Sequence, residues 1–231
     1  MKKWERLPRF MQCDEVREYY DILCKKSFSL ALKRVFDIVV ASMLLVVCAV
    51  PMIVIGIKIV TESEGGIFYR QVRVTRYGKE FRIHKFRTMV NGADKMGTKV
   101  TVADDCRITP TGAFLRKYRL DELPQLIDVL AGDMSFVGTR PEVPEYVRRY
   151  TAEMRATLLL PAGITSEASI HYKDEAKTLC EKDKNVDEVY VGKVLPKKMK
   201  YNLQGLRKFS LGGDILIMIR TIFAVIKKGG S

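Results

Sequence analysis

Two adjacent carboxylates, Asp121 and Glu122, form the part of the chain best suited to chemistry. The apolar residues after them recur at helical spacing as far as Gly132, so we expect a helix that begins at about Asp121 and ends there. The positive end of a helix favours the ionised form of a carboxylate, by about 0.3–1 kcal/mol at an exposed site. An ionised carboxylate in this place could serve as a nucleophile or as a magnesium ligand.

Arginines flank the acid pair, with Arg116 before it and Arg140 after it, and the pattern allows two interpretations. In the first, Asp121 caps the helix, Glu122 is an ordinary first-turn acid, and the arginines neutralise them. In the second, the arginines bind phosphate, because a planar guanidinium makes paired, charge-assisted hydrogen bonds. Pro141 and nearby glycines indicate a rigid backbone around Arg140, which favours a defined phosphate site.

The composition narrows the class of partner. The formal net charge of +13 indicates an anionic one: nucleic acid, an anionic membrane surface or a phosphorylated substrate. The five cysteines are odd in number, widely spaced and without a C-x-x-C pair, which argues against a disulfide framework or a zinc site and suits the reducing cytosol. The chain also lacks the motifs of P-loop nucleotide hydrolases, dinucleotide-binding dehydrogenases, zinc proteases and serine hydrolases.

The elements that must position the acid pair begin with an apolar segment. No side chain from residue 38 to residue 57 is charged, which is long enough to cross a bilayer as a helix. Pro51 should kink this helix. A single span should have more basic residues on its cytoplasmic side, but here they flank both ends, so they indicate no orientation across the membrane. We therefore expect a bent helix over 33–60 that enters one leaflet and returns, with Arg34 and Asp37 paired at the headgroups. A buried core helix is the alternative.

Two further segments are candidates for the membrane surface. Residues 1–32 lack the features of a signal peptide and are expected to be an amphipathic, basic leader on the membrane or a solvated extension. Residues 212–228 are apolar but interrupted by charges, so we expect an interfacial helix, with a buried domain helix as the alternative.

Between these segments, residues 67–89 alternate as strands do around a turn at Gly78, which predicts a β-hairpin and the only substantial sheet. Its second strand ends with the cations Lys85 and Arg87, which are either site residues or a charged strand edge. Asp104 and Asp105, in a polar loop, are either metal ligands or a solvated acidic turn. We expect a helix over 142–160 and then a loop to residue 165, with further helical pieces at 172–183, 187–191 and 195–208. The fold class is therefore α+β and mostly α.

In this order the motifs are those of a known family. The chain, from about residue 33 to residue 228, resembles the bacterial sugar transferase family, the monotopic polyprenol-phosphate phosphoglycosyl transferases that begin glycan assembly on a lipid carrier. The motifs that carry the resemblance are Lys33-Arg34-Val35-Phe36-Asp37, the hairpin with Lys85-Phe86-Arg87, Leu120-Asp121-Glu122-Leu123-Pro124-Gln125, and Gly132-Asp133-Met134-Ser135.

The resemblance implies a reaction and its partners. A UDP-sugar donates its phosphosugar to undecaprenyl phosphate with release of UMP, through a covalent aspartyl-phosphosugar intermediate and with Mg²⁺ as cofactor. Asp121 would be the nucleophile and Glu122 the magnesium ligand. Arg116 and Arg140 would bind phosphates, supported by Lys85 and Arg87. Pro141 and Lys173 complete the substrate-binding set.

The resemblance also implies where the protein works. Residues 1–32 would be the leader, 33–60 the re-entrant membrane helix, and 61–231 a catalytic domain on the cytoplasmic face of the bacterial inner membrane. Anionic lipids are expected partners, nucleic acid is not, and a homodimer is compatible with the pattern. A sugar-nucleotide hydrolase and a non-enzymatic membrane-surface adaptor remain as alternative functions.

The chain departs from the family pattern in three places. Val50 precedes Pro51 where a serine is common, and Thr139 begins the stretch that is usually Pro-Arg-Pro. The loop from Ser166 to Lys173 differs from the usual sequence, which allows for an unusual sugar donor.

Overall fold

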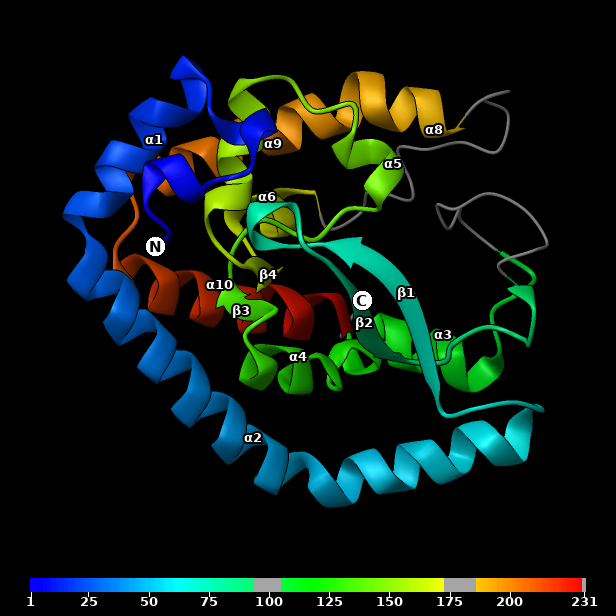
Figure 1. Cartoon of the computed structure of the whole chain (residues 1–231). Helices are drawn as coiled ribbons and strands as arrows, with labels where there is room; N and C mark the ends of the chain where they lie inside the picture. Colours follow the sequence, from blue (N-terminus) through cyan, green and yellow to red (C-terminus); the bar gives the residue numbers. More distant parts are fainter. Residues whose placement is uncertain (94–104, 173–185, 230–231) are drawn as a thin grey trace.

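The computed structural model describes residues 1–93, 105–172 and 186–229. The fold is mostly helical with small sheets, as the sequence predicts. The long helix α2 (Ser27–Glu62) curves along one side of the molecule, with α4 (Gln125–Ala131) and α10 (Leu211–Gly229) on its concave side (Figure 1). Helices α1 (Asp14–Lys25) and α9 (Leu195–Arg207) pack together at the opposite edge.

One narrow stripe of α2 faces the rest of the domain. Residues spaced three or four apart share one face of a helix, and the buried positions of α2 follow that rule. They are Lys33, Asp37, Ala41, Gly56 and Ile59. The other faces are apolar and exposed: the exposed fractions of Val46, Val50 and Ile53 are 79%, 70% and 62%. So much apolar surface is unsuited to water and marks an interaction surface.

By length and composition, α2 could cross a membrane, and only 6% of its most apolar 18-residue window is buried. A core helix would be mostly buried, so the core-helix alternative is wrong. The helix continues through Pro51. These features support membrane association, whereas a course that enters and leaves the same leaflet stays a prediction.

The predicted hairpin is confirmed. Strands β1 (Phe68–Val74) and β2 (Glu80–Phe86) pair in antiparallel register, with Arg70 opposite His84. The connecting turn places Tyr77 at φ 62° and Gly78 at φ 76°, the left-handed backbone conformation that glycine adopts at low cost.

The hairpin is not the only sheet. Strand β3 (Met134–Val137) pairs in parallel with β4 (Ala162–Thr165). The prediction of a loop as far as residue 165 was therefore wrong. Each strand has four residues, too few for a strong alternating pattern, and their pairing depends on chain segments far apart in sequence.

The N-terminal residues belong to the domain core. Met11, Tyr19 and Leu23 are buried in the same cluster as Leu195 and Met199 of α9. Burying these large side chains contributes about 1.5–3 kcal/mol each. The segment is therefore not a solvated extension, and several of its aromatic residues pack within the domain. Its contact with a membrane surface stays a prediction.

The helices predicted at 187–191 and 195–208 are confirmed, whereas the one predicted over 142–160 is not continuous. Two short pieces, α5 (Pro144–Val147) and a 3-10 helix (Glu153–Leu159), replace the single helix expected over 142–160. Helix α3 (Pro110–Lys117) precedes the acid pair, and α6 (Glu167–His171) follows β4. Helix α8 (Val186–Val189) leads through a π-helical turn (Tyr190–Val194) into α9. The helix expected at 172–183 falls almost entirely outside the described residues.

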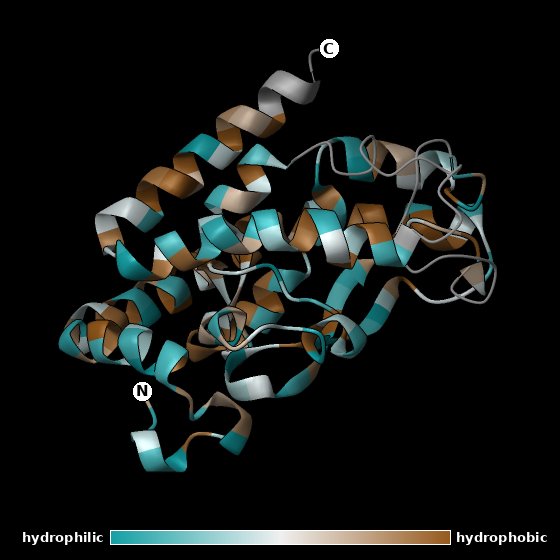
Figure 2. Ribbon diagram, turned by 90° about the horizontal axis from the view of Figure 1, so that it is seen from above, coloured by the Kyte–Doolittle hydropathy of each residue, from teal (hydrophilic) through white to brown (hydrophobic). Residues whose placement is uncertain are grey.

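Helix α10 has features of both expected alternatives, the buried domain helix and the interfacial helix. Asp214 is buried and Met218 packs against the core that β3 shares, while the exposed fractions of Leu216, Ile222 and Phe223 are 55%, 59% and 67%. Figure 2 shows the hydrophobic bands of this helix, which ends at the C label. One face is thus a domain face, and the other is an exposed apolar surface like that of α2.

Candidate active site

The acid pair lies in a tight turn before α4 and not in the helix itself. Asp121 and Glu122 belong to a 3-10 turn, Leu120–Glu122, and the α-helix begins only at Gln125. Gly132 ends α4 at φ 86°, as predicted. The turn is entered through Arg119, whose φ of 58° is uncommon for a residue other than glycine.

Glu122 is buried and surrounded by cations. Its Oε1 accepts hydrogen bonds from Arg140 at 2.7 Å, from Lys85 at 3.0 Å and from Arg119 at 3.4 Å. Burial alone would raise the pKa of this carboxyl, but the three cations together hold it well below its ordinary value. Glu122 is therefore a permanent anion that gathers three positive charges at one point.

Asp121 has the opposite environment. Its side chain is buried, and Oδ1 has no hydrogen-bond partner within the described part of the chain. Burial, followed by repulsion from Glu122, raises the pKa of Asp121 above its ordinary value, although Lys85 and Arg119 oppose the shift. The expectation that the helix end keeps this carboxylate ionised is thus wrong in sign, because desolvation outweighs a weak dipole effect.

Two side chains fix α4 against its neighbours. Asp128 accepts hydrogen bonds from the backbone N–H of His84 at 2.9 Å and from its Nδ1 at 2.6 Å. At the other end of α4, Arg34 donates to the carbonyl oxygens of Val129 and Leu130, at 2.5 and 2.8 Å. A cation here also complements the negative end of the helix. The turn with the acid pair is thereby held between the hairpin and α2.

The charged residues at the start of α2 make their contacts inside the domain. Lys33 and Asp214 of α10 form a buried ion pair at 2.5 Å, and Asp37 accepts a hydrogen bond from the backbone N–H of Phe136 at 3.4 Å. The expected pairing of Arg34 with Asp37 at the headgroups is therefore wrong. Both side chains anchor α2 to the elements that surround the acid pair.

The stretch that carries Arg140 is fixed from two sides. The carbonyl of Pro141, which is buried, accepts a hydrogen bond from Arg73 at 3.2 Å. The backbone N–H of Gly163, in β4, donates to the carbonyl of Thr139 at 2.9 Å. The sequence therefore predicted correctly that the backbone around Arg140 is held, and the second sheet is part of what holds it.

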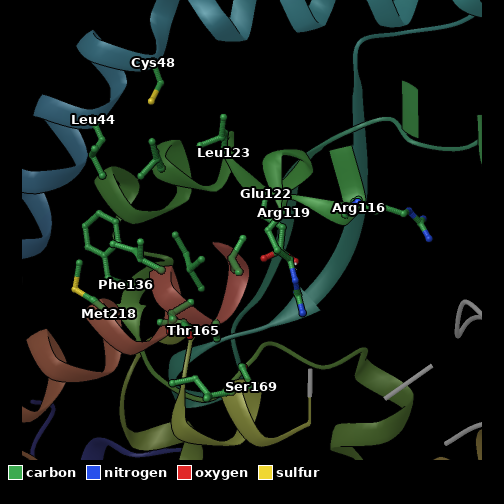
Figure 3. A pocket seen from close by; sticks show the side chains of 18 residues that line it. Leu44, Cys48, Arg116, Arg119, Glu122, Leu123, Phe136, Thr165, Ser169 and Met218 are labelled. Atoms are coloured by element: carbon green, nitrogen blue, oxygen red, sulfur yellow. Dashed lines mark hydrogen bonds and ion pairs between the residues drawn. The ribbon is translucent and has the colours of Figure 1, made fainter. Parts of the chain in front are cut away.

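The other predicted residues fall into three groups. Arg116 lies beside the acid pair, but its Nε donates to Thr88 at 2.8 Å and its side chain points away from Glu122 (Figure 3). Arg87 is not in the site: its guanidinium donates to the carbonyls of Ile59, Ser63 and Glu64 at the end of α2. Lys173 lies outside the described residues.

The acidic loop before α3 is not a solvated turn where the structure describes it. Asp105 is buried and forms a short ion pair with Arg107, at 2.5 Å. Asp104 lies outside the described residues. Among the residues that are described, no group of three or more histidine, cysteine, aspartate or glutamate side chains could hold a metal ion.

A cavity of about 330 Å³ opens beside the acid pair. Its walls come from α2, α4, β3, β4, α6 and α10, as Figure 3 shows. The lining is mostly apolar, including Leu44, Leu126, Phe136, Met218 and Ile222. The charged residues of its lining are Arg116, Lys117, Arg119 and Glu122. The arrangement places a cluster of cations beside an apolar cavity.

Three residues of the site were not assigned from the sequence: Arg119, His84 and Asp128. Arg119 stands three positions before Glu122, the spacing at which side chains of one helical turn meet, so its position held a usable signal. No signal in the local sequence indicated the hydrogen bond between His84 and Asp128, because it joins a strand to a helix 44 residues away.

Several known proteins have sequences similar to this one. The model of the family described as bacterial sugar transferase matches residues 28–228. A Bacillus subtilis protein with the provisional name undecaprenyl-phosphate N-acetylgalactosaminyl 1-phosphate transferase is 43% identical over 150 residues, which cover 64% of this chain and 82% of the relative. The UDP-glucose:undecaprenyl-phosphate glucose-1-phosphate transferase of Klebsiella pneumoniae is 33% identical over 84% of this chain and 40% of the relative.

A third relative is similar to this chain over most of the length of both proteins. The exopolysaccharide production protein ExoY of Sinorhizobium fredii is 30% identical over 86% of this chain and 87% of its own length. The chain thus spans most of the shorter relatives but about two fifths of the longer one. With the family match extending over nearly the whole sequence, the chain belongs to the bacterial sugar transferase family.

Proposed function

We propose that this protein transfers a phosphosugar from a UDP-sugar to undecaprenyl phosphate and releases UMP. The relatives' names describe transfers of this kind, with undecaprenyl phosphate as the acceptor. The observation that carries the proposal is the position of the acid pair, between three cations on Glu122 and an apolar cavity. The phosphates of the donor and of the lipid need cations, and the hydrocarbon of the lipid needs an apolar space close to them.

In this mechanism Lys85 and Arg140 bind the diphosphate of the donor and offset its charge. An oxygen of Asp121 attacks the β-phosphorus, and the bond to the UMP oxygen breaks, so UMP leaves with the electron pair. An oxygen of the lipid phosphate then attacks the same phosphorus and displaces Asp121, which regains its carboxylate. The unpartnered Oδ1 of Asp121 supports its role as the nucleophile, because no hydrogen bond must first be broken.

The carboxylates also fit a magnesium ion. Mg²⁺ commonly takes one or two carboxylates together with substrate phosphates, which is the donor set this site could provide. Glu122 is the carboxylate that would hold the ion, beside the cations that would bind the substrate phosphates. Bound there, Mg²⁺ would neutralise charge on the transferred phosphoryl group.

The site would work at the cytoplasmic face of the inner membrane. The exposed apolar surfaces of α2 and α10 would enter the bilayer, and both helices also line the cavity, through Leu44 and Met218. A lipid could then reach the acid pair from the membrane while its sugar nucleotide partner comes from the cytosol.

The test is UMP release by the purified protein given a UDP-sugar and undecaprenyl phosphate, with intact-protein mass measured after the donor alone. Asp121→Asn should abolish both UMP release and the phosphosugar adduct, because an amide is not an ionised nucleophile. Asp133→Asn, at the far end of α4, is the matched control and should retain activity. Without the lipid, the mechanism allows one equivalent of UMP per protein molecule, so UMP release over many turnovers without the lipid would instead indicate a hydrolase. Near-normal turnover by Asp121→Asn would overturn the mechanism.

A further inference from the structure

The three cations that contact Glu122 reach it from different sides. Lys85 comes from β2, and Arg140 comes from the stretch after β3. Arg119 comes from the turn before the acid pair, and of the three it alone is among the described residues that line the apolar cavity. The cations are thus divided between two regions that share one carboxylate.

The backbone of Arg119 is unusual for its residue type. Its φ of 58° and ψ of 21° place it in the left-handed region, which costs roughly 1 kcal/mol or more for residues other than glycine. Glycine would adopt this conformation freely. Such backbone strain occurs most often at functional sites, which directs attention to what the side chain does there.

The side chain points toward the region where two substrates would meet. Figure 3 shows Arg119 and Glu122 side by side, extending into the space bordered by Thr165 and Ser169, whereas Arg116 points away. The side chain of Arg119 is 40% exposed, so it is accessible to an anion from solvent. The apolar residues Phe136 and Met218 line the part of the cavity away from Arg119 (Figure 3).

A cation at the edge of an apolar cavity matches one chemical class, a phosphate attached to a long hydrocarbon. A nucleotide offers no hydrocarbon, and a neutral lipid offers no charge. The cavity is also lined by α2 and α10, the helices with exposed apolar faces, so a lipid chain can extend from it into a bilayer.

We propose that Arg119 binds the phosphate of the polyprenyl phosphate acceptor, while Lys85 and Arg140 bind the phosphates of the sugar nucleotide. This assignment rests on the proposed function. It explains why three cations converge on Glu122: two anionic substrates must approach each other beside Asp121, and each brings its charge to a separate cation.

Three variants separate the side chain from the backbone. Arg119→Ala removes the guanidinium and keeps the backbone strain, Arg119→Gly removes the guanidinium and relieves that strain, and Arg119→Lys keeps a positive charge. Arg149→Ala removes an exposed arginine that pairs with Glu188 far from the cavity and is the matched control. All are purified in detergent, and their melting temperatures are compared first.

The kinetic readout is the Michaelis constant for each substrate, measured by UMP release. In Arg119→Gly and Arg119→Ala, loss of a charge-assisted hydrogen bond should raise the constant for polyprenyl phosphate by about tenfold or more. The constant for the UDP-sugar and the rate of adduct formation from the donor alone should stay within about twofold of the wild type. Arg119→Lys should recover part of the acceptor affinity.

A binding measurement makes the result independent of turnover. Native mass spectrometry compares a short polyprenyl phosphate with the matching polyprenol, and the wild type should prefer the phosphate. That preference should disappear in Arg119→Gly. An unchanged preference, or an equal rise in the Michaelis constants for donor and acceptor, would overturn the assignment. Absence of UMP release by the wild type would overturn the proposed function, while the binding comparison would still decide the role of Arg119.

Discussion

The carboxylate of Asp128 accepts two hydrogen bonds from His84, one from its backbone N–H at 2.9 Å and one from its Nδ1 at 2.6 Å. This pair joins the middle of α4 to β2, the strand whose next residue is Lys85. The distance between Lys85 and Glu122 therefore depends on it. The turn that carries the acid pair is thus linked to the hairpin both through Lys85 and through this contact of α4.

The first prediction concerns this contact. Asp128→Ala should lower the free energy of unfolding by about 1–3 kcal/mol, because buried donors lose their acceptor. That corresponds to a fall in melting temperature of roughly 2–4 °C per kcal/mol for a chain of this size. The control is Asp21→Ala, which removes an exposed pair with Arg17 and should change stability by less than about 1 kcal/mol. Equal melting temperatures for the two variants would contradict the structural role of Asp128.

The second prediction concerns the pH dependence of UMP release. Burial and the charge of Glu122 raise the pKa of Asp121, and the nucleophile must be ionised. Activity should therefore fall as the pH decreases through this raised pKa, at a higher pH than an ordinary aspartate with a pKa near 3.8 would give. The positive charge of Lys85 lowers the pKa of Asp121, so Lys85→Gln should move the acid limb to still higher pH. A limb that shifts downward in Lys85→Gln would show that another group controls it.

The third prediction is that the two carboxyl groups affect the stability of the folded protein in opposite ways. A raised carboxyl pKa means that the folded state binds the proton more tightly, so the stability from Asp121 is present at low pH and lost as the pH rises through that pKa. The lowered pKa of Glu122 has the opposite sign, with stability present above its unfolded-state pKa and lost as the pH falls. At neutral pH, Asp121→Asn should raise the melting temperature and Glu122→Gln should lower it. Changes of the same sign in both variants would contradict these environments.

The elements with strong local patterns were predictable. The apolar run of α2 and the alternation of the hairpin depend on residues close in sequence, and Gly132 ends α4 where expected. The acid pair and Arg140 also come together as predicted.

What the sequence could not show depends on contacts between distant segments. Tyr19 and Leu23 look like parts of a membrane-surface helix until the burial against α9 is seen, because both environments select an amphipathic pattern. The pairing of β3 with β4 and the bond from Arg34 to α4 join residues that are distant in sequence. The raised pKa of Asp121 follows from burial, which local sequence does not report.

The fourth prediction separates the roles of Lys85, near the end of β2, and Arg87, the first residue after that strand. Arg87 donates to three carbonyls near the end of α2, so Arg87→Ala should lower the melting temperature. It should leave the Michaelis constant for the UDP-sugar within about twofold, because the guanidinium does not contact the acid pair. Lys85→Ala should show the reverse pattern, with a larger effect on the donor constant. A strong increase in that constant for Arg87→Ala would restore Arg87 to the binding site.

The fifth prediction tests the close approach between β3 and β4. A Cβ added at Gly163 would overlap the backbone nitrogen and oxygen of Gly138, so neither strand could keep its position. Gly163→Ala should destabilise the protein by about 1–3 kcal/mol or more. It should also raise the Michaelis constant for the UDP-sugar, because the hydrogen bond from Gly163 to Thr139 holds the stretch that carries Arg140.

The matched control is a second glycine-to-alanine substitution, which should change the stability in the opposite direction. Gly205 lies on α9 with open space around the position of its Cβ. Gly205→Ala should therefore stabilise the protein by about 0.5–1 kcal/mol, since alanine favours a helix interior over glycine. Thermal unfolding and UMP release of both variants decide the matter. If Gly163→Ala retained the wild-type melting temperature and donor constant, the parallel sheet would not be what positions Arg140, and the bond from Arg73 to Pro141 would have to suffice.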